Sequence, residues 1–454
     1  MLYILRRKTN EMKRIELEKG SKKILNAWAF YDWANSVYSL VISSAVFPIF
    51  YGALFRLYDV ESVRVFGLDL ERGVLISYVS SAAFVVIALA TPMVSGIADY
   101  LGNKRFFLKF FCYLGALSCI GLYWFSLDYI YLSLLFYFGG LVGSWMSIAI
   151  YNSYLPDVAH KEQQDRISAK GFSMGYVGSV LLLVVNLAMV MKPDLFGIEG
   201  SPDQPAEMIA MRYSFITVGL WWMLFSQYTF WYMPKGNKKE GSRKEIFLGG
   251  FNELKKVREE IKELSFLKKY LVAFFIYSMA VQTILLIAAY FGEQEINWGG
   301  DTERTVGLIV SILLIQLVAI VGSVITGRLA ERYNNISLLV VINAIWMLLC
   351  IYAFFVETPN QFYIAAGFVG LVMGSIQTLS RSTYSQNLPS TKDTTSYFSF
   401  YEVAEKIGIV IGTFLYGYIA QVTGSMRSAA LFLGVFFLIG AILLRRLRKA
   451  IPNP

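Results

Sequence analysis

The chain has 454 residues, of which 56% are apolar and 16% are charged. Soluble globular domains average roughly 45–50% apolar and about 25% charged residues, so this composition indicates a membrane protein. All three cysteines lie inside long apolar runs, which excludes a scaffold held together by disulfides. The single histidine, His160, lies in a polar stretch and argues against a His-cluster zinc site or a serine hydrolase. We therefore expect no enzyme activity, no bound metal and no cofactor.

Apolar stretches of about 20 residues, the length that crosses a bilayer as a helix, recur along the whole chain. They form two series of six, and a polar segment separates the two series. The pattern predicts an all-α membrane protein with twelve transmembrane helices in two pseudo-symmetric six-helix bundles. The expected spans are 26–54, 73–97, 106–126, 130–153, 169–191, 212–233, 269–291, 305–327, 337–356, 362–384, 398–421 and 427–445.

The positive charges are distributed unevenly between the two sides that these spans define. Of the 41 Lys and Arg residues, 34 fall on or near the side that holds both termini, and 7 fall on the other side. Positive residues concentrate in cytoplasmic segments, so both termini are expected in the cytoplasm. This sorting accounts for the net charge of +9, and we expect no nucleic-acid site. The expected parts are a basic tail at 1–25, a bundle at 26–233, a linker at 234–268, a bundle at 269–445 and a tail at 446–454.

Part of the linker is expected to form a helix. Leu254, Val257, Ile261 and Leu264 recur at spacings of three and four residues, which places them on one face of a helix. The other positions of this segment are mainly charged. We therefore expect an amphipathic helix that lies along the cytoplasmic face of the membrane.

The two series of spans resemble each other at two places. Asp99 follows the second span and Glu331 follows the eighth, and the two residues stand 232 positions apart. The segment that ends the fourth span, 151–156, matches 384–389 at the end of the tenth with an offset of 233. Two matches at nearly one offset indicate a duplication. Transporters built from two such parallel halves bind substrate between the halves, near the middle of the membrane.

The loop after the second span carries a recognisable motif. It matches the pattern G-x-L-A-D-x-x-G-R/K-R/K, which is the loop signature of the major facilitator superfamily. Ser95 and Asn103 depart from that pattern. The matching residues are Ala98, Asp99, Gly102, Lys104 and Arg105, and the degenerate second copy contains Gly327, Leu329, Ala330, Glu331 and Arg332.

Further segments narrow this resemblance to one branch of the superfamily. They are YDWANS at 31–36, Asn152 with the LPD sequence at 155–157, GSIQTLSRS at 374–382 and YEV at 401–403. Together they resemble the vacuolar-effluxer-like branch, that of the autophagy-related amino-acid effluxers, over nearly all of 26–445. The resemblance implies a secondary transporter, with amino-acid movement as the activity of the fungal vacuolar members.

Asp32 is the first candidate for a substrate or proton site. It lies about two turns into the first span, where an ionisable side chain costs roughly 2.5–3.5 kcal/mol unless it faces protein or water. Asn35, one turn further on, has an amide that can both donate and accept hydrogen bonds. The alternative is that these two side chains only join helices. Tyr31, Asn152 and Gln377 complete the candidate substrate and proton set.

Charged residues on the tenth and eleventh spans form a second cluster. Arg381 lies about one turn before the expected end of its span, and Glu402, Glu405 and Lys406 lie in the first turns of the next. We expect Arg381 to pair with one of these carboxylates and to serve as a gate or coupling site. A fixed structural ion pair is the alternative.

The expected activity is secondary transport of a small polar solute by alternating access, with a proton as the coupling ion. A neutral or zwitterionic amino acid is the expected solute, and a sugar or a cell-wall-derived glycopeptide is the alternative. A non-transporting membrane sensor is the alternative function. The sequence contains no GxxxxGK[ST] loop, which argues against coupling to ATP hydrolysis within this chain. We expect a monomer in the bacterial inner membrane, with the solute, a proton and the lipid bilayer as its partners.

The charge bias yields a test of topology. A cysteine introduced at Ser242, in the linker, should resist a membrane-impermeant thiol reagent added outside intact cells. A cysteine at Ser201, between the fifth and sixth spans, should react with it. Labelling at the first position together with protection at the second would reverse the predicted orientation.

Overall fold

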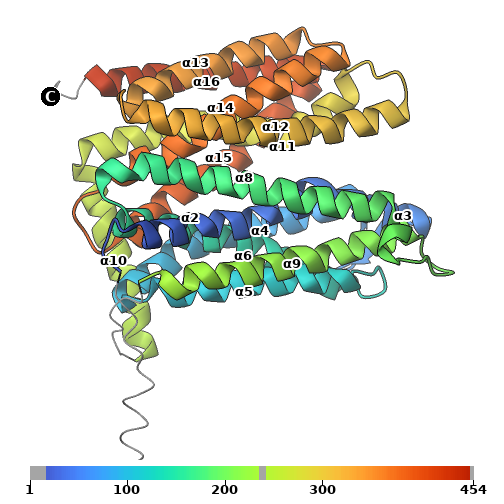
Figure 1. Ribbon diagram of the computed structural model, residues 1–454, viewed down its shortest axis with the longest axis horizontal. Helices are drawn as coiled ribbons and strands as arrows, with labels where there is room; N and C mark the ends of the chain where they lie inside the picture. The colour runs from blue at the N-terminus through green and yellow to red at the C-terminus, as the bar shows by residue number, and fades with distance from the viewer. Residues whose placement is uncertain (1–16, 235–241, 450–454) are drawn as a thin grey trace, which may run out of the picture.

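The computed structural model describes residues 17–234 and 242–449. In these residues it contains twelve helical spans that are long and apolar enough to cross a membrane, which confirms the predicted fold class (Figure 1). Much of the expected tail at 1–25, the 235–241 part of the linker and the last five residues lie outside the described ranges. In chain order the helices are α2 Lys22–Val37, η1 Tyr38–Val46, α3 Phe47–Leu57, α4 Arg72–Leu101, α5 Lys104–Gly121, η2 Leu122–Trp124, α6 Ile130–Asn152, α7 Leu155–Val158, α8 Lys161–Met191, η3 Pro193–Phe196, α9 Ala206–Tyr232, α10 Arg243–Glu263, α11 Ser265–Glu295, α12 Asp301–Ala330, α13 Asn335–Phe354, α14 Pro359–Gln386, α15 Thr394–Thr423 and α16 Met426–Lys449.

The long helices lie side by side, and each half of the chain builds its own apolar core. One core is formed by buried side chains of α2 to α9, and the other is formed almost entirely by those of α10 to α16. The contact between the halves runs mainly through α8 with α12 and α14, and through α4 with α15. Figure 1 shows α2 beginning, α16 ending and α10 lying at the same end of the bundle. We call this end the α10 face.

The first span is a composite helix. The segment η1 is a nine-residue π-helical stretch between α2 and α3, and Pro48 stands in the first turn of α3. Proline has no N–H to donate and its ring collides with the carbonyl four residues earlier, so the regular α-helical bonding pattern cannot continue through it. The wider π-helical turns of η1 directly precede Pro48, where the α-helical hydrogen bonds are interrupted.

A short hairpin that the sequence analysis did not predict joins α3 to α4 at the end opposite the α10 face. Its strands, β1 Ser62–Val65 and β2 Leu68–Glu71, pair antiparallel, with Val65 opposite Leu68. The two turn residues, Phe66 and Gly67, both have positive φ, at 50° and 83°. Positive φ at both central positions gives the turn a twist that matches the strands.

The linker helix α10 packs against other helices, and not only along the membrane surface as expected. On the first half, α10 lies so close to α4 that a Cβ atom at Gly96 would come within 2.2 Å of the carbonyl oxygen of Gly250. On the second half, Lys256 donates to Asp393 at 2.7 Å, and Tyr397 donates to Glu260 at 2.6 Å. The carboxylate of Asp393 raises the pKa of the Lys256 ammonium, because it stabilises the charged form. The helix therefore contacts both halves at the α10 face.

This packing predicts that Gly250 tolerates no side chain. A Cβ atom there would lie 2.6 Å from Cγ1 of Ile97 and 2.8 Å from its backbone nitrogen. Gly250→Val should lower the free energy of unfolding by about 1–3 kcal/mol, the usual penalty of overpacking. Gly417→Val is the matched control, because a Cβ at Gly417 in α15 would meet no atom within 4 Å. Denaturant unfolding of both variants in detergent checks the difference, and equal losses would contradict it.

Candidate functional site between the two halves

An ion pair between Asp32 and Arg381 joins the two halves. Both terminal nitrogens of the Arg381 guanidinium lie 3.2 Å from Oδ2 of Asp32, and Tyr151 donates to the same oxygen at 2.8 Å. Asp32 comes from α2 and Arg381 from α14, and the two residues are only 8% and 2% exposed. The pair is therefore a buried ion pair between helices that belong to different halves.

Helix α8 holds the guanidinium from the side of the first half. Ser168 accepts from Nε of Arg381 at 3.0 Å, and its backbone carbonyl accepts from Nη2 at 2.9 Å. The face of the guanidinium lies over the ring of Phe172, 3.9 Å from its centroid, where a cation is attracted by the ring electrons. One turn above Ser168 on α8, Gly171 leaves space for the pair, because a Cβ there would contact both Asp32 and Arg381.

Asn152 connects this ion pair to a second group of charges on α15. Its amide oxygen accepts from Arg381 at 3.2 Å, and its amide nitrogen donates to Glu402 at 2.8 Å. Lys406 donates to Glu402 at 2.8 Å and to Glu405 at 2.6 Å. The Lys406 ammonium also lies over the ring of Trp145, 3.9 Å from its centroid. One polar network therefore runs from Asp32 on α2 to Glu405 on α15.

The charge pairing differs from the one expected from the sequence. Arg381 was expected to pair with Glu402 or Glu405, but it pairs with Asp32, and Lys406 neutralises the glutamates. The reason is geometric. Asn152 lies between Arg381 and Glu402 and bonds to both, while Lys406 lies one turn after Glu402 on the same helix.

The other candidate residues contact different neighbours around this network. Gln377, half-buried on α14, accepts from the hydroxyl of Tyr176 on α8 at 2.5 Å, so it also joins the halves. Asn35 donates to Ser147 at 3.2 Å and thus links α2 to α6 inside the first half. Tyr31 is fully buried in the first core, where its ring packs on Tyr151 with 4.9 Å between centroids. Asn35 and Tyr31 thus contact other residues of the first half.

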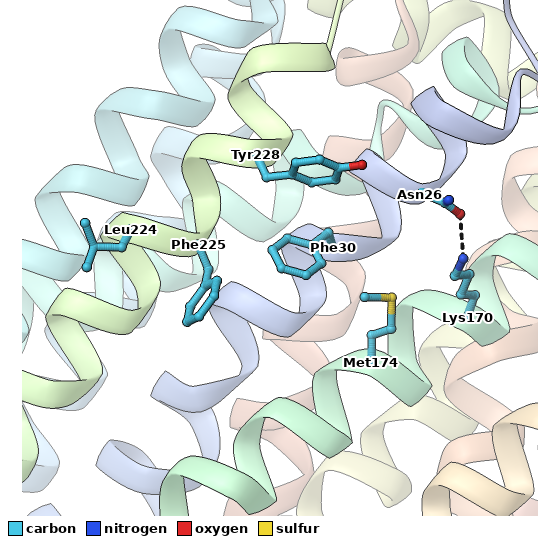
Figure 2. Close-up of a pocket in the computed structure, with 7 residues that line it drawn as sticks. All are labelled: Asn26, Phe30, Lys170, Met174, Leu224, Phe225 and Tyr228. Carbon is cyan, nitrogen blue, oxygen red and sulfur yellow. Dashed lines mark hydrogen bonds between the residues drawn. The ribbon is translucent and has the colours of Figure 1, made fainter.

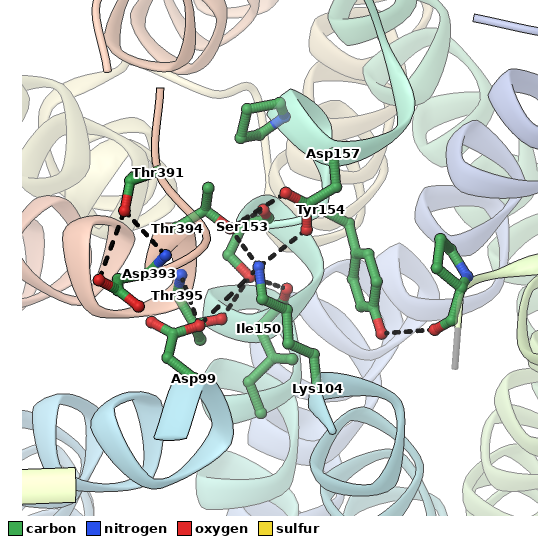
Figure 3. Close-up of polar contacts among 12 residues, drawn as sticks. Asp99, Lys104, Ile150, Ser153, Tyr154, Asp157, Thr391, Asp393, Thr394 and Thr395 are labelled. Atoms are coloured by element: carbon green, nitrogen blue, oxygen red, sulfur yellow. Dashed lines mark hydrogen bonds and ion pairs between the residues drawn. The ribbon is translucent and has the colours of Figure 1, made fainter. Parts of the chain in front are cut away.

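The first copy of the loop signature closes the α10 face (Figure 3). Asp99 at the end of α4 accepts from the backbone N–H groups of Thr395 at 3.3 Å and Ser396 at 2.6 Å. These groups lie in the first turn of α15, where the helix dipole favours a negative charge. Lys104 donates to Asp157 at 2.8 Å and also contacts Thr394.

The remaining signature residues shape this loop. Gly102 ends α4 with a left-handed φ of 61°, and Arg105 is buried in the first turn of α5. Asn103, which departs from the family pattern, caps α5 by accepting from the N–H of Phe106 at 3.3 Å.

The second copy of the signature does not repeat these contacts. Glu331 and Arg332 are exposed, and Gly327 packs against Ala169 of α8. The buried carboxylate of this region is Asp165, on the first turns of α8. Asn335 donates to it at 2.7 Å and Gln386 donates at 2.6 Å. In this copy the acid therefore belongs to the first half and its donors belong to the second.

Sequence reasoning missed several members of the site. Ser168 and Asp165 were placed in a loop, because the polar turns of 161–168 carry no apolar run, yet α8 begins at Lys161. Tyr151 was named only as the first residue of the repeated segment 151–156. Its place in that segment is the feature of the sequence that could have marked it as a site residue. Nothing in the sequence singles out Trp145 or Phe172 among the many aromatic residues.

The geometry predicts which mutations are coupled. Arg381→Gln leaves Asp32 buried without its cation and should lower the free energy of unfolding by about 3–5 kcal/mol. Adding Asp32→Asn should recover part of that loss. Adding Glu295→Gln, the matched control, should be additive within about 0.5 kcal/mol, because Glu295 pairs with Arg427 and lies outside this network. Equal recovery by both second mutations, measured by denaturant unfolding, would show that the observed pairing does not govern stability.

Comparison with known proteins places this arrangement in a family. Residues 20–450 match the family described as "Vacuole effluxer Atg22 like". The "Uncharacterized MFS-type transporter YxiO" of Bacillus subtilis is 30% identical over 92% of this chain and 93% of its own length. "Autophagy-related protein 22-2" of Aspergillus fumigatus is 23% identical over 83% of this chain and 74% of its own length.

Solved structures agree at the level of the fold. The E. coli fucose:proton symporter FucP superposes with a TM-score of 0.67 at 16% identity, over 94% of this chain and 97% of that one. FucP in the outward conformation gives a TM-score of 0.65 at 15% identity, over 94% and 98% of the two chains. The chain therefore belongs to the vacuole effluxer Atg22-like family and is a membrane transporter of the major facilitator type.

Proposed function

We propose that this protein carries a small polar solute, in particular a neutral or zwitterionic amino acid, together with a proton. The observation that carries the proposal is the buried ion pair between Asp32 and Arg381, which joins the two halves. We place the protein in a bacterial inner membrane with the α10 face in the cytoplasm, in keeping with the distribution of Lys and Arg. Alternating access then requires the contacts at this face to open.

The ion pair favours a zwitterionic solute. Separating the halves separates Asp32 from Arg381, and removing one partner of a buried pair costs about 3–5 kcal/mol. A solute with one ammonium and one carboxylate compensates both residues at once, because its ammonium faces Asp32 and its carboxylate faces the Arg381 guanidinium. A neutral sugar offers hydroxyl groups but no charge, so it leaves this penalty uncompensated.

The charges of the network favour a proton as the coupling ion. Asp32, Glu402 and Glu405 are three carboxylates, whereas Arg381 and Lys406 are the two cations that contact them. One negative charge is therefore in excess within this cluster. A proton bound to a carboxylate neutralises the excess and weakens that residue's hold on its cation, which ties protonation to the separation of the halves.

Transport in proteoliposomes tests the proposal. Protein reconstituted under an imposed proton gradient should accumulate a labelled neutral amino acid, with uptake toward the α10 face as the favoured direction. Movement of a sugar or glycopeptide in place of amino acids would contradict the proposed amino-acid solute but would still show that the protein is a carrier. If no solute moves, the chain has a sensing role on this scaffold.

The same assay tests the role of Asp32. Asp32→Asn keeps the side-chain shape but removes the charge and the titratable group. It should lower proton-driven accumulation by at least about tenfold, since a change of about 1.4 kcal/mol in one step of the cycle gives that factor. Asp203→Asn, at an exposed loop position, is the control and should transport normally. Unchanged uptake and an unchanged pH profile in the Asp32 variant would make that residue structural.

A further inference from the structure

A groove opens between α2, α8 and α9, on the outer side of the first half and away from the Asp32–Arg381 pair. Its volume is about 440 Å³, within the range of small-ligand sites. In Figure 2 the polar groups of Asn26, Lys170 and Tyr228 lie toward one side of the groove, and Phe225 and Leu224 lie toward the other. Seven residues line it: Asn26, Phe30, Lys170, Met174, Leu224, Phe225 and Tyr228. The groove is therefore polar on one side and apolar on the other.

The cation of this groove has a neutral partner. The ammonium of Lys170 donates to the amide oxygen of Asn26 at 2.5 Å. Within residues 17–234 and 242–449, no carboxylate lies within ion-pair distance of it. Of the seven residues that line the groove, Lys170 is the one that carries a charge.

Aromatic residues place the polar side of the groove near the boundary of the bilayer. Tyr228, Trp231 and Tyr232 end α9, and Trp and Tyr concentrate where membrane meets water. The ammonium of Lys23 lies over the ring of Tyr232, 4.6 Å from its centroid. Lys170 lies nine residues into α8, about 13.5 Å along the helix axis, and its long side chain reaches back toward this level.

We propose that this groove binds an anionic phospholipid of the leaflet on the α10 side. The lipid phosphate accepts hydrogen bonds from Lys170 and from the amide nitrogen of Asn26, with the Tyr228 hydroxyl beside it. An acyl chain lies along Phe30, Met174, Leu224 and Phe225. A basic pocket between membrane helices is suited to a charged headgroup. The proposal is independent of the transported solute, because none of the groove residues belongs to the ion network between the halves.

The bilayer is the source of the occupant, since the groove lies between membrane-spanning helices and its apolar side is made of exposed side chains. Leu224 is 62% exposed and Phe225 is 36% exposed. A free phosphate ion would leave these side chains uncovered. A lipid covers them and neutralises Lys170 in the same binding event, which is why the charge and the apolar wall point to one ligand.

Lipid retention on the purified full-length protein tests the proposal. The protein is incubated in neutral detergent with phosphatidylglycerol, with phosphatidylcholine or with inorganic phosphate, and bound lipid is counted by native mass spectrometry. Wild-type protein should retain phosphatidylglycerol over phosphatidylcholine. Lys170→Gln should lower that preference about fivefold, the effect of one Lys near an anionic surface. Met174→Trp, which fills the apolar side while keeping Lys170, should lower retention of both lipids.

Lys161→Gln is the matched control, because Lys161 is exposed on the same helix and outside the groove. It should retain phosphatidylglycerol like the wild type. Melting of each variant without lipid shows whether it is folded. An undiminished preference in Lys170→Gln would overturn the proposal, as would equal retention of the two lipids by the wild type. Equal thermal stabilisation by inorganic phosphate and by phosphatidylglycerol would identify a free-anion site.

Discussion

The buried contact between Asp32 and Arg381 constrains the interface of the two halves more than any other interaction. A carboxylate and a guanidinium can be buried only if they meet, and here the two come from α2 and α14. Gly171 leaves room for them, Tyr151 and Ser168 supply further hydrogen bonds, and an aromatic ring covers the guanidinium. The surroundings are specific to this pair, so a change at any of these positions acts through it. In the proposed function, a ligand or proton that competes for either partner acts on this pair.

The contacts at the α10 face follow the same principle, because acidic side chains are again buried against partners from the other half. Asp99 bonds to the start of α15, Asp165 bonds to residues of α13 and α14, and α10 adds contacts to both halves. At both copies of the loop signature a carboxylate of the first half accepts hydrogen bonds from the second half, but the carboxylate comes from a different position in each copy. In the first copy the acid lies in the signature itself, and in the second it lies on the facing helix.

The sequence allowed the twelve spans and the charged residues at the interface to be predicted, because bilayer length and burial cost act on local stretches of chain. It did not allow the pairing of those charges to be predicted. Whether Arg381 meets Asp32 or Glu402 depends on the side of α14 that faces α2, and on Asn152 lying between them. The start of α8 was placed too late, since its first turns are polar, and Ser168 was lost with them. The packing of α10 on α4 depends on Gly96 and Gly250, which have no side chain to give a pattern.

The distribution of charge between the halves bears directly on how they separate. Within the network, the first half contributes one charged group, Asp32, together with the neutral Tyr151, Asn152 and Ser168. The second half contributes Arg381 and Lys406 together with Glu402 and Glu405, so its share is balanced. Separation of the halves would leave Asp32 without its cation and Arg381 without its carboxylate partner. A carboxylate at that depth is costly alone. In the proposed transport cycle, a cationic group, either a proton or the ammonium of a solute, accompanies the opening and binds at Asp32 on the first half.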